Sequence, residues 1–557
     1  MECLDSRRLT GPNLIQDEPG AIIDVRCDAS ERADLTASWR EEARRFLDDV
    51  GWTDEQTATH DYPYGVSLAI SAPIDALYAA SELNDAAYES ACRRLRGAAA
   101  VDTSSRVAEL TRLIAQERNP RLIALQKAAA EHGALFLSDD DFASVGMGKS
   151  SQTWPVSELP DPGSVPWESI GRIPVGLVTG TNGKTTSVRM LAAMAAGHTV
   201  GTSSTEGLRI GTELLEAGDY SGPGGARNIL RHERVDFAIL ETARGGLQRR
   251  GLGVSRADAA LITNIAADHL GDFGVHDLEA LADVKWVVTR ALTEPDATLV
   301  INAGDPLLAA RASGASCPVL RFSPDTEIAQ QGGGPYVTVR DDLIVIGDGT
   351  EERSLVRVDA VPLTFGGAAR HNIENALGAV GLARALGLTD EAIVSGLVGT
   401  EPNDIPGRGN LYRIGDVTVL VDFAHNPHGL RAVMDLAENL PVKRRLLSIG
   451  QAGDRPDDLI RELVSEAARF RADKILVKRY SKYARGRGEG EVANLIARSF
   501  VDTGVAADSI ETFDDDLDAT PAALAWARSG DLLLLLVLTD QDEVIEMLKR
   551  RVEHDPA

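Results

Sequence analysis

The feature that most constrains this chain is an apolar run that leads into a glycine turn and a Lys-Thr-Thr sequence. Residues 173–178 read Ile-Pro-Val-Gly-Leu-Val, and residues 179–186 read Thr-Gly-Thr-Asn-Gly-Lys-Thr-Thr. The pattern predicts a buried strand, a tight turn and a helix that begins near Lys184. In such a turn, backbone N–H groups and the positive end of the helix face a polyphosphate. The sequence therefore favours a phosphate-binding loop over an exposed turn before a helix.

This loop is a variant of the P-loop pattern, because the usual first glycine falls at Val178 and the glycine has moved to Gly180. We expect Lys184 to neutralise charge on the β- and γ-phosphates, and Thr185 to offer its hydroxyl to Mg²⁺. The predicted nucleotide-binding residues of the loop are Gly180, Thr181, Asn182, Gly183, Lys184, Thr185 and Thr186.

Composition limits the class of protein further. A chain of 557 residues is too long for one core and predicts several domains. Its formal charge of −27 argues against nucleic acid or an anionic membrane surface as the main partner. The four cysteines lack metal-ligand spacing, the N-terminus lacks a signal-peptide pattern, and the most apolar stretch, 532–538, is too short to span a bilayer. We therefore expect a cytoplasmic protein with no nucleic-acid or membrane partner.

Two clusters of loop-forming residues divide the chain. Four prolines within 155–166 predict a linker, and Pro, Gly and Asn gather again at 402–409. Strand-like runs alternate with helical patterns between these clusters, and a second such series follows. The prediction is a multidomain α/β protein. Its parts are an N-terminal α/β module over 1–160 with a helix near 106–132, a central parallel-sheet P-loop ATPase domain over 161–404 and a Rossmann-like α/β domain over 405–557.

Polar residues follow two of the predicted central strands, where ligands bind in open parallel sheets. The run 237–240 leads into Glu241, and the run 260–262 leads through Thr-Asn-Ile-Ala-Ala into Asp268 and His269. Mg²⁺ prefers oxygen ligands and keeps water and phosphates in its shell, so Glu241 beside a P-loop is a candidate ligand. His269 is a less usual Mg²⁺ ligand, and a structural histidine is the alternative.

Six motifs in a fixed order resemble the Mur ligase family, whose members join an amine to a carboxylate with ATP. They are Gly-Thr-Asn-Gly-Lys-Thr (180–185), Thr-Asn-Ile-Ala-Ala-Asp-His-Leu-Gly (263–271), His-Asn-Ile-Glu-Asn-Ala (371–376), Ile-Pro-Gly-Arg (405–408), Asp-Phe-Ala-His-Asn-Pro (422–427) and Gly-Asp-Arg (453–455). The resemblance covers about residues 165–557.

Within that family, residues 241–253 and 484–492 look most like the Mur-type half of cyanophycin synthetases, and residues 7–13 are similar to the way these enzymes begin. The chain departs from them in one large way. Only about 160 residues precede the predicted central domain, so we expect the ATP-grasp domain, which in these enzymes lies between the N-terminal module and the P-loop, to be absent. The resemblance also suggests that the N-terminal module grips a peptide-like acceptor, and it leaves open whether a partner supplies the missing activity and whether the chain forms a homo-oligomer.

The resemblance implies a magnesium centre. Thr185, Glu241 and His269 would serve the Mg²⁺ sites. Lys285 matches a lysine that many members carbamylate, and a carbamate turns the cation into an anion that can bind a second Mg²⁺. An ordinary lysine on a helix surface is the alternative for Lys285.

The resemblance also implies a nucleotide site shared with the C-terminal domain. Asn372 matches the residue that contacts adenine, and Arg408 and Asp422 match residues that close on the nucleotide. The implied catalytic set is Lys184, His269, Lys285 and Arg408. The expected cofactors are ATP and Mg²⁺, with a carbamylated Lys285 in question.

The implied reaction joins a carboxylate-bearing acceptor to an amine, which is expected to be an amino acid. The carboxylate becomes an acyl phosphate, and the amine then attacks the acyl carbon. The basic run Lys478, Arg479, Lys482, Arg485 and Arg487 is either a collar for acceptor carboxylates or a solvated loop. Two other functions stay open. One is a P-loop GTPase switch, although the chain has no Asn-Lys-x-Asp motif for guanine recognition. The other is a non-catalytic Mur-like scaffold.

Overall fold

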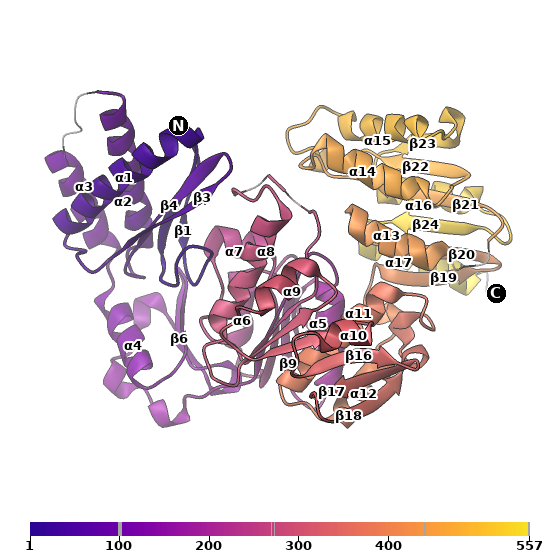
Figure 1. Cartoon of the computed structure of the whole chain (residues 1–557), viewed down its shortest axis with the longest axis horizontal. Helices are drawn as coiled ribbons and strands as arrows, with labels where there is room; N and C mark the ends of the chain where they lie inside the picture. The colour runs from indigo at the N-terminus through magenta and orange to yellow at the C-terminus, as the bar shows by residue number, and fades with distance from the viewer. Residues whose placement is uncertain (99–102, 269, 272, 439, 441, 555–557) are drawn as a thin grey trace.

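The computed structural model describes residues 1–98, 103–268, 270–271, 273–438, 440 and 442–554. Three lobes follow one another along the chain, and Figure 1 shows the first and the last lobe standing apart above the middle one. The middle lobe contacts both neighbours, through main-chain bonds such as Thr10 N–H to the Arg250 carbonyl at 2.8 Å and through side chains such as Asn182 with Asn426.

The N-terminal module starts with a four-stranded antiparallel sheet in the order β1-β2-β4-β3, and two helices cover one face of it. Successive strand residues point to opposite faces, so Ile23 and Leu68 pack under the helices with Trp39, whereas Ile22 lies on the other face. A small three-stranded sheet, β5-β6-β7, ends the module. The elements are β1 (Glu2–Leu9), β2 (Gly20–Arg26), α1 (Ala29–Asp49), β3 (Thr57–Tyr62), β4 (Gly65–Ser71), α2 (Leu77–Leu95), α3 (Thr103–Glu117), α4 (Pro120–Glu131), β5 (Phe136–Ser138), β6 (Phe142–Val145) and β7 (Gln152–Pro155).

The single helix predicted near 106–132 is wrong, because the structure has two helices there, α3 and α4. Asn119 caps α4 by accepting the N–H of Leu122 at 3.2 Å, and Pro120 takes the first helical position. Proline has no N–H to donate and its ring clashes with the preceding turn, so α3 ends before it.

The central domain is built on an 11-stranded sheet in the order β11-β10-β9-β12-β8-β13-β14-β15-β16-β17-β18. The strands from β9 to β16 in this order are parallel, and antiparallel hairpins extend both edges. The P-loop strand β8 lies between β12 and β13, so the ends of these three strands meet at one edge. The strands are β8 (Val175–Thr179), β9 (Val200–Ser204), β10 (Gly207–Ile210), β11 (Glu213–Ala217), β12 (Phe237–Glu241), β13 (Ala259–Ile262), β14 (Thr298–Asn302), β15 (Val319–Phe322), β16 (Tyr336–Arg340), β17 (Leu343–Gly347) and β18 (Glu352–Arg357).

Helices cover both faces of this sheet. On β8, Leu177 belongs to the core under α6, α7, α8 and α9, and its neighbour Val178 belongs to the core under α5, α11 and α12. The near-continuous apolar strands follow from burial on both sides. The helices are α5 (Lys184–Met194), α6 (Pro223–Leu230), α7 (Arg244–Arg250), α8 (Leu278–Trp286), α9 (Pro306–Ala312), α10 (Thr326–Gln330), α11 (Arg370–Ala385) and α12 (Asp390–Gly399).

The C-terminal domain is a second, smaller α/β layer structure with the strand order β19-β20-β24-β21-β22-β23. Only β19 runs antiparallel to its neighbour in this sheet as described, and the apolar strand β24 lies near its middle. The elements are β19 (Arg408–Ile414), β20 (Val417–Asp422), α13 (Pro427–Glu438), β21 (Arg445–Gly450), α14 (Asp457–Ala468), β22 (Lys474–Lys478), α15 (Glu491–Asp502), β23 (Ile510–Phe513), α16 (Asp516–Trp526), β24 (Leu532–Leu536) and α17 (Gln541–His554).

Between β7 and β8 the chain is irregular apart from short 3₁₀ turns, and another 3₁₀ turn, Pro402–Asp404, separates α12 from β19. The domain limits that the sequence predicts at 160 and 404 fall within these segments and remain predictions. In the described part of the chain, every helix is too short or too polar to cross a membrane.

Candidate active site

The P-loop follows β8 and is held from behind by the segment after β13. Gly180 and Gly183 have φ values of 146° and 82°, which favour glycine. A Cβ at Gly180 would lie 1.8 Å from Oγ1 of Thr263, and a Cβ at Gly183 would lie 2.0 Å from Oδ1 of Asn375. Both positions therefore require glycine for space as well as for backbone conformation. Asn375 belongs to the motif at 371–376, and no local pattern distinguishes it from the other residues of that motif.

Lys184 begins α5 and is half-buried, with Nζ donating to the Thr181 carbonyl at 3.0 Å. The next residue, Thr185, is buried and donates its hydroxyl to Oε2 of Glu241 at 2.9 Å. Sheet order explains this contact, because Glu241 ends β12, the strand beside β8. The structure thus brings the Lys-Thr pair of the loop and the strand-end carboxylate together.

The Glu241 carboxylate is buried and fits a metal ligand. Burial raises its pKa, while the charges of Lys184 and Arg408 and the hydroxyl of Thr185 oppose the rise. Among the residues that the structure describes, its Oε1 atom has no hydrogen-bond partner. A buried, unsatisfied carboxylate oxygen costs free energy, and a hard cation such as Mg²⁺ would satisfy it.

Thr205, which the sequence reasoning missed, belongs to the same centre. It follows β9, the strand on the other side of β12, and its hydroxyl lies 3.2 Å from that of Thr185. Its backbone N–H also favours the charged form of Glu241. The available signal was the small polar residue directly after an apolar strand.

Lys285 lies on α8 with 3% of its surface exposed. Burial lowers its pKa far below the ordinary value, and the charges of Lys184 and Arg244 add to the effect while Asp268 opposes it. A buried lysine is therefore not the ordinary surface lysine of the alternative interpretation. Its neutral amine is the form that reacts with carbon dioxide. His269, the other predicted metal ligand, lies outside the described residues.

Residues of both domains that are predicted to bind the nucleotide line one pocket. Asn372, buried on α11, donates to the Leu363 carbonyl at 2.8 Å and accepts from Asn375 at 3.1 Å. The unfilled space is about 740 Å³ including the open mouth of the pocket. Lining residues include Asn182, Gly183, Thr186, Phe322, His371, Asn372, Glu374, Asn375, Arg408, Asp422, Phe423, His425 and His428.

Arg408 and Asp422 come from neighbouring strands of the C-terminal domain, β19 and β20. The Arg408 guanidinium lies 4.6 Å from the centre of the Phe423 ring. Burial raises the pKa of Asp422 to about 6, and the charge of Arg408 opposes that rise. Of the histidines lining the pocket, His371 is half-buried, and its pKa is lowered to about 4 by loss of solvation and by His428.

Comparison with known proteins agrees with this arrangement. The model of the Mur ligase middle domain matches residues 178–383, and the model of the Mur ligase glutamate ligase domain matches residues 407–536. This chain belongs to the Mur ligase family. The family membership and the multidomain α/β fold predicted from the sequence are confirmed, and a GTPase switch is not favoured.

Among the relatives of this Mur ligase family member are cyanophycin synthetases. The protein of that name from Crocosphaera subtropica is 38% identical over 379 residues, 66% of this chain and 43% of the relative. The one from Synechocystis is 36% identical over 406 residues, 71% of this chain and 45% of the relative. This chain therefore spans less than half the length of these relatives.

This chain is also similar to a Mur-type ligase in sequence and to a solved structure in fold. A UDP-N-acetylmuramoyl-L-alanyl-D-glutamate–2,6-diaminopimelate ligase from Geobacter metallireducens is 28% identical, covering 68% of this chain and 76% of that protein. The structure of E. coli FolC in complex with DHPP and ADP has a TM-score of 0.51 and 22% identity, covering 68% of this chain and 89% of FolC. The similarity to FolC shows only that the two proteins share a fold.

In this family member, the basic run of the C-terminal domain is neither a uniform collar nor wholly a solvated loop, the two alternatives left by the sequence. Lys478 is wholly buried, and its Nζ pairs with Asp516 at 2.6 Å and donates to the Leu536 carbonyl. Arg487 pairs with Asp457 at 2.6 Å and bonds two main-chain carbonyls. Of the five cations, Lys482, Arg485 and the salt-bridged Arg479 remain exposed.

Proposed function

We propose that this chain is an ATP-dependent ligase that activates a carboxylate as an acyl phosphate for attack by an amine. The observation that carries the proposal is the buried pair of Thr185 and Glu241 beside Lys184, with one carboxylate oxygen unsatisfied and Lys285 buried nearby. This set of charges suits phosphoryl transfer, in which catalysis is mainly positioning and electrostatic stabilisation.

Each residue of the centre has a separate task in the proposed reaction. Lys184 offsets the negative charge that opposes approach of the acceptor carboxylate to the γ-phosphate. Thr185 and Glu241, together with His269, would hold Mg²⁺, which supplies Lewis-acid charge stabilisation when bound. Asn372, Arg408 and Asp422 hold the nucleotide across the domain junction, and this junction shields the centre from water.

The two proposed steps need no reactant besides ATP, the acceptor carboxylate and the amine. A carboxylate oxygen of the acceptor bonds to the γ-phosphorus, and ADP leaves with the electrons of the broken P–O bond. The neutral amine then bonds to the acyl carbon, phosphate leaves with the C–O electrons, and the nitrogen releases its proton. Holding both partners in line contributes on the order of 7–11 kcal/mol in well-oriented reactions.

Lys285 is proposed to be carbamylated. Its lowered pKa supplies the neutral amine, which would bond to the carbon of carbon dioxide and release one proton. The charges of Lys184 and Arg244 repel the protonated lysine, and they would attract the carbamate anion. The carbamate would hold a second Mg²⁺ with oxygen atoms, the ligand type that this ion prefers.

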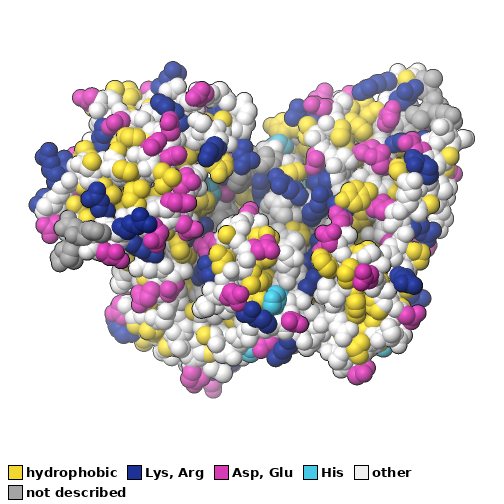
Figure 2. Space-filling model, turned by 180° about the vertical axis from the view of Figure 1, so that it is seen from behind, with side chains coloured by type: hydrophobic (Ala, Val, Ile, Leu, Met, Phe, Trp, Pro, Cys, Tyr) yellow, Lys and Arg dark blue, Asp and Glu magenta, His cyan; other side chains and the backbone are white. Residues whose placement is uncertain are grey.

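The acceptor is proposed to carry carboxylates. Figure 2 shows Lys and Arg side chains gathered in the hollow between the two outer lobes, on a chain whose net charge is −27. Near the N-terminal module, Arg249 is exposed, and its guanidinium lies 5.7 Å from the centre of the Phe273 ring. On the C-terminal side, Lys482 and Arg485 are exposed. Arginine binds carboxylates bidentately, and relatives named cyanophycin synthetase support the same acceptor class.

The test measures ADP formation in four mixtures. One contains ATP alone, and the others contain ATP with a single amino acid, with an acidic peptide, or with an amino acid and an acidic peptide together. The proposal expects ADP formation that requires a peptide and an amine, with the peptide gaining the mass of the amine less water. Lys184→Ala should abolish ADP formation while circular dichroism stays that of the wild type. ADP formation that ignores all added amines and carboxylates, or persists in folded Lys184→Ala, would refute the ligase assignment.

A further inference from the structure

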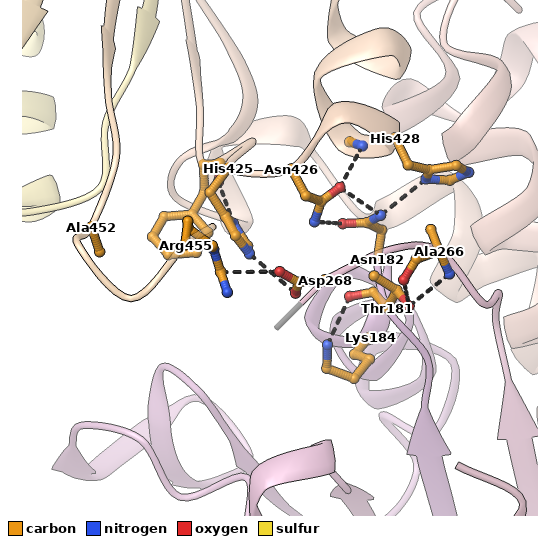
Figure 3. A network of polar contacts seen from close by, with 12 residues as sticks. Thr181, Asn182, Lys184, Ala266, Asp268, His425, Asn426, His428, Ala452 and Arg455 are labelled. Carbon is orange, nitrogen blue, oxygen red and sulfur yellow. Dashed lines mark hydrogen bonds and ion pairs between the residues drawn. The ribbon is translucent and has the colours of Figure 1, made fainter. Parts of the chain in front are cut away.

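One P-loop side chain reaches across to the C-terminal domain. Nδ2 of Asn182 donates to Oδ1 of Asn426 at 3.2 Å, and Nδ2 of Asn426 donates back to Oδ1 of Asn182 at 3.0 Å (Figure 3). Nδ2 of Asn182 also lies 2.9 Å from Nδ1 of His428. The two amides therefore form a reciprocal pair between residues 244 positions apart in the sequence.

The backbone of Asn182 is fixed by the central domain. Its N–H donates to Oδ1 of Asn264 at 3.0 Å, and its carbonyl accepts from Oγ1 of Thr263 at 2.6 Å and Nδ2 of Asn264 at 3.1 Å. The next residues are Gly183 and Lys184, which belong to the phosphate-binding turn. Because the backbone is held on one side, the contact of the Asn182 side chain with the C-terminal domain acts directly on this turn.

Asn426 is fixed in turn by its own domain. Only 3% of its surface is exposed, and its Oδ1 caps α13 by accepting the N–H of Gly429 at 2.8 Å. A Cβ at Gly429 would lie 3.2 Å from Oδ1 of Asn182, so the first turn of α13 approaches the P-loop closely. The contact is therefore set by two rigid elements rather than by two loose side chains.

A second bridge links the two domains near Lys184. Asp268, after β13, pairs with Arg455 at 3.0 Å and with Nε2 of His425 at 3.6 Å. Figure 3 shows Lys184 on the central-domain side of both contacts, close to Asp268. The C-terminal domain thus contacts the central domain at two points near the lysine that would face the γ-phosphate.

We propose that Asn426 is a positioning residue for phosphoryl transfer, which acts by pairing with Asn182 and so makes the P-loop geometry depend on docking of the C-terminal domain. This inference rests on the proposed ligase function and deepens it. An acyl phosphate formed before the C-terminal domain is docked would be exposed to water. Coupling the turn to docking limits activation to the state in which the pocket is complete.

The test is a double-mutant cycle with Asn182→Ala and Asn426→Ser. Serine retains an oxygen that can cap α13, but it is too short to pair with Asn182. We expect each single variant to lower kcat by about tenfold or more, with the KM for ATP changed less than about threefold, because the pair acts on the transition state. The double variant should be no slower than the slower single one, which makes the coupling about tenfold, or about 1.4 kcal/mol.

The chain offers a matched control in Asn119, which caps α4 and is followed by Pro120 just as Asn426 is followed by Pro427. Asn119→Ser makes the same local change in the N-terminal module and should retain the wild-type kcat. A second measurement does not depend on turnover. Amide hydrogen exchange at residues 180–186 should slow when a non-hydrolysable ATP analogue binds the wild type, and should slow much less in Asn426→Ser.

Additive effects on kcat, with the double variant slowed by the product of the single factors, would overturn the inference. Wild-type kcat in folded Asn426→Ser would also overturn it and leave the amide pair as simple adhesion between domains. If the wild type forms no ADP, the ligase proposal fails by itself. The hydrogen-exchange comparison then still decides the inference, because equal protection in wild type and Asn426→Ser would refute it.

Discussion

Replacing Glu241 by Gln should stabilise the protein without nucleotide and remove its response to Mg²⁺ and nucleotide. The carboxylate is buried, and Oε1 has no partner among the described residues. An unsatisfied buried polar atom costs about 1–3 kcal/mol, and more when it is charged. Gln has the same shape, can accept the Thr185 hydroxyl bond at the Oε2 position and carries no charge, so we expect a gain of about 1–2 kcal/mol.

This gain corresponds to a rise of about 2–8 °C in the melting midpoint, since 1 kcal/mol shifts a domain of this size by about 2–4 °C. Adding Mg²⁺ and a non-hydrolysable ATP analogue at about 100 times its Kd should stabilise the wild type by about 2.7 kcal/mol. Glu241→Gln should gain much less. The order of the two midpoints is therefore expected to reverse between the two conditions, which differential scanning calorimetry can measure.

The pH dependence of the same variant has a definite sign. Burial raises the pKa of Glu241 above its ordinary value of 4.5, so the folded state binds the proton more tightly than the unfolded state. The free energy of unfolding of the wild type consequently falls as pH rises from the unfolded pKa through the folded one. The advantage of Glu241→Gln should be small at pH about 4 and complete at higher pH.

Asp516→Asn is the matched control, because Asp516 is an equally buried carboxylate with satisfied oxygens. It pairs with Lys478 at 2.6 Å and accepts from Tyr480 at 2.7 Å and from Thr539. Removing one partner of a buried ion pair costs about 3–5 kcal/mol, so this variant should be destabilised. The reasoning on Glu241 is refuted if Glu241→Gln melts below the wild type without ligand, or if it keeps the full shift with Mg²⁺ and nucleotide.

Three further predictions concern individual groups. Lys285→Ala should lower ligase activity by more than about 100-fold. Added formate or acetate, but not bicarbonate, should restore part of this activity. Wild-type kinetics in Lys285→Ala would exclude the carbamate. Because the pKa of Asp422 is raised to about 6, its charge opposite Arg408 is lost below that pH. The kcat/KM for ATP should therefore fall as pH drops through about 6, and Asp422→Asn should remove this limb, whereas an unchanged limb would assign it to another group. The double variant Arg249→Glu and Arg485→Glu should raise the KM for the acceptor more than the KM for ATP. Arg551→Glu, at an exposed position elsewhere, is the control and should change neither KM. An acceptor KM in the double variant equal to that of the control would rule out acceptor binding by Arg249 and Arg485.

The sequence by itself determined the features that depend on short stretches of chain. The order of apolar strand, glycine, lysine and threonine sets the P-loop, because positive φ at Gly183 and the helix start at Lys184 are local requirements. Glu241 was predictable in the same way, as a carboxylate placed directly after an apolar strand. The break at Pro120 was also readable, and overlooking it joined two helices into one.

Only the tertiary structure decided which of these stretches meet. Thr205 joins the Thr185–Glu241 pair because β9 lies beside β12, an order that no local pattern encodes. The burial of Lys478 against Asp516 likewise results from sheet and helix packing, and the sequence shows it only as one member of a basic run. The pairing of Asn182 with Asn426 depends on how one domain docks on another. Local chemistry fixes backbone conformation within a few residues, whereas long-range contacts follow from burying whole faces of sheets and helices, which the complete chain decides together.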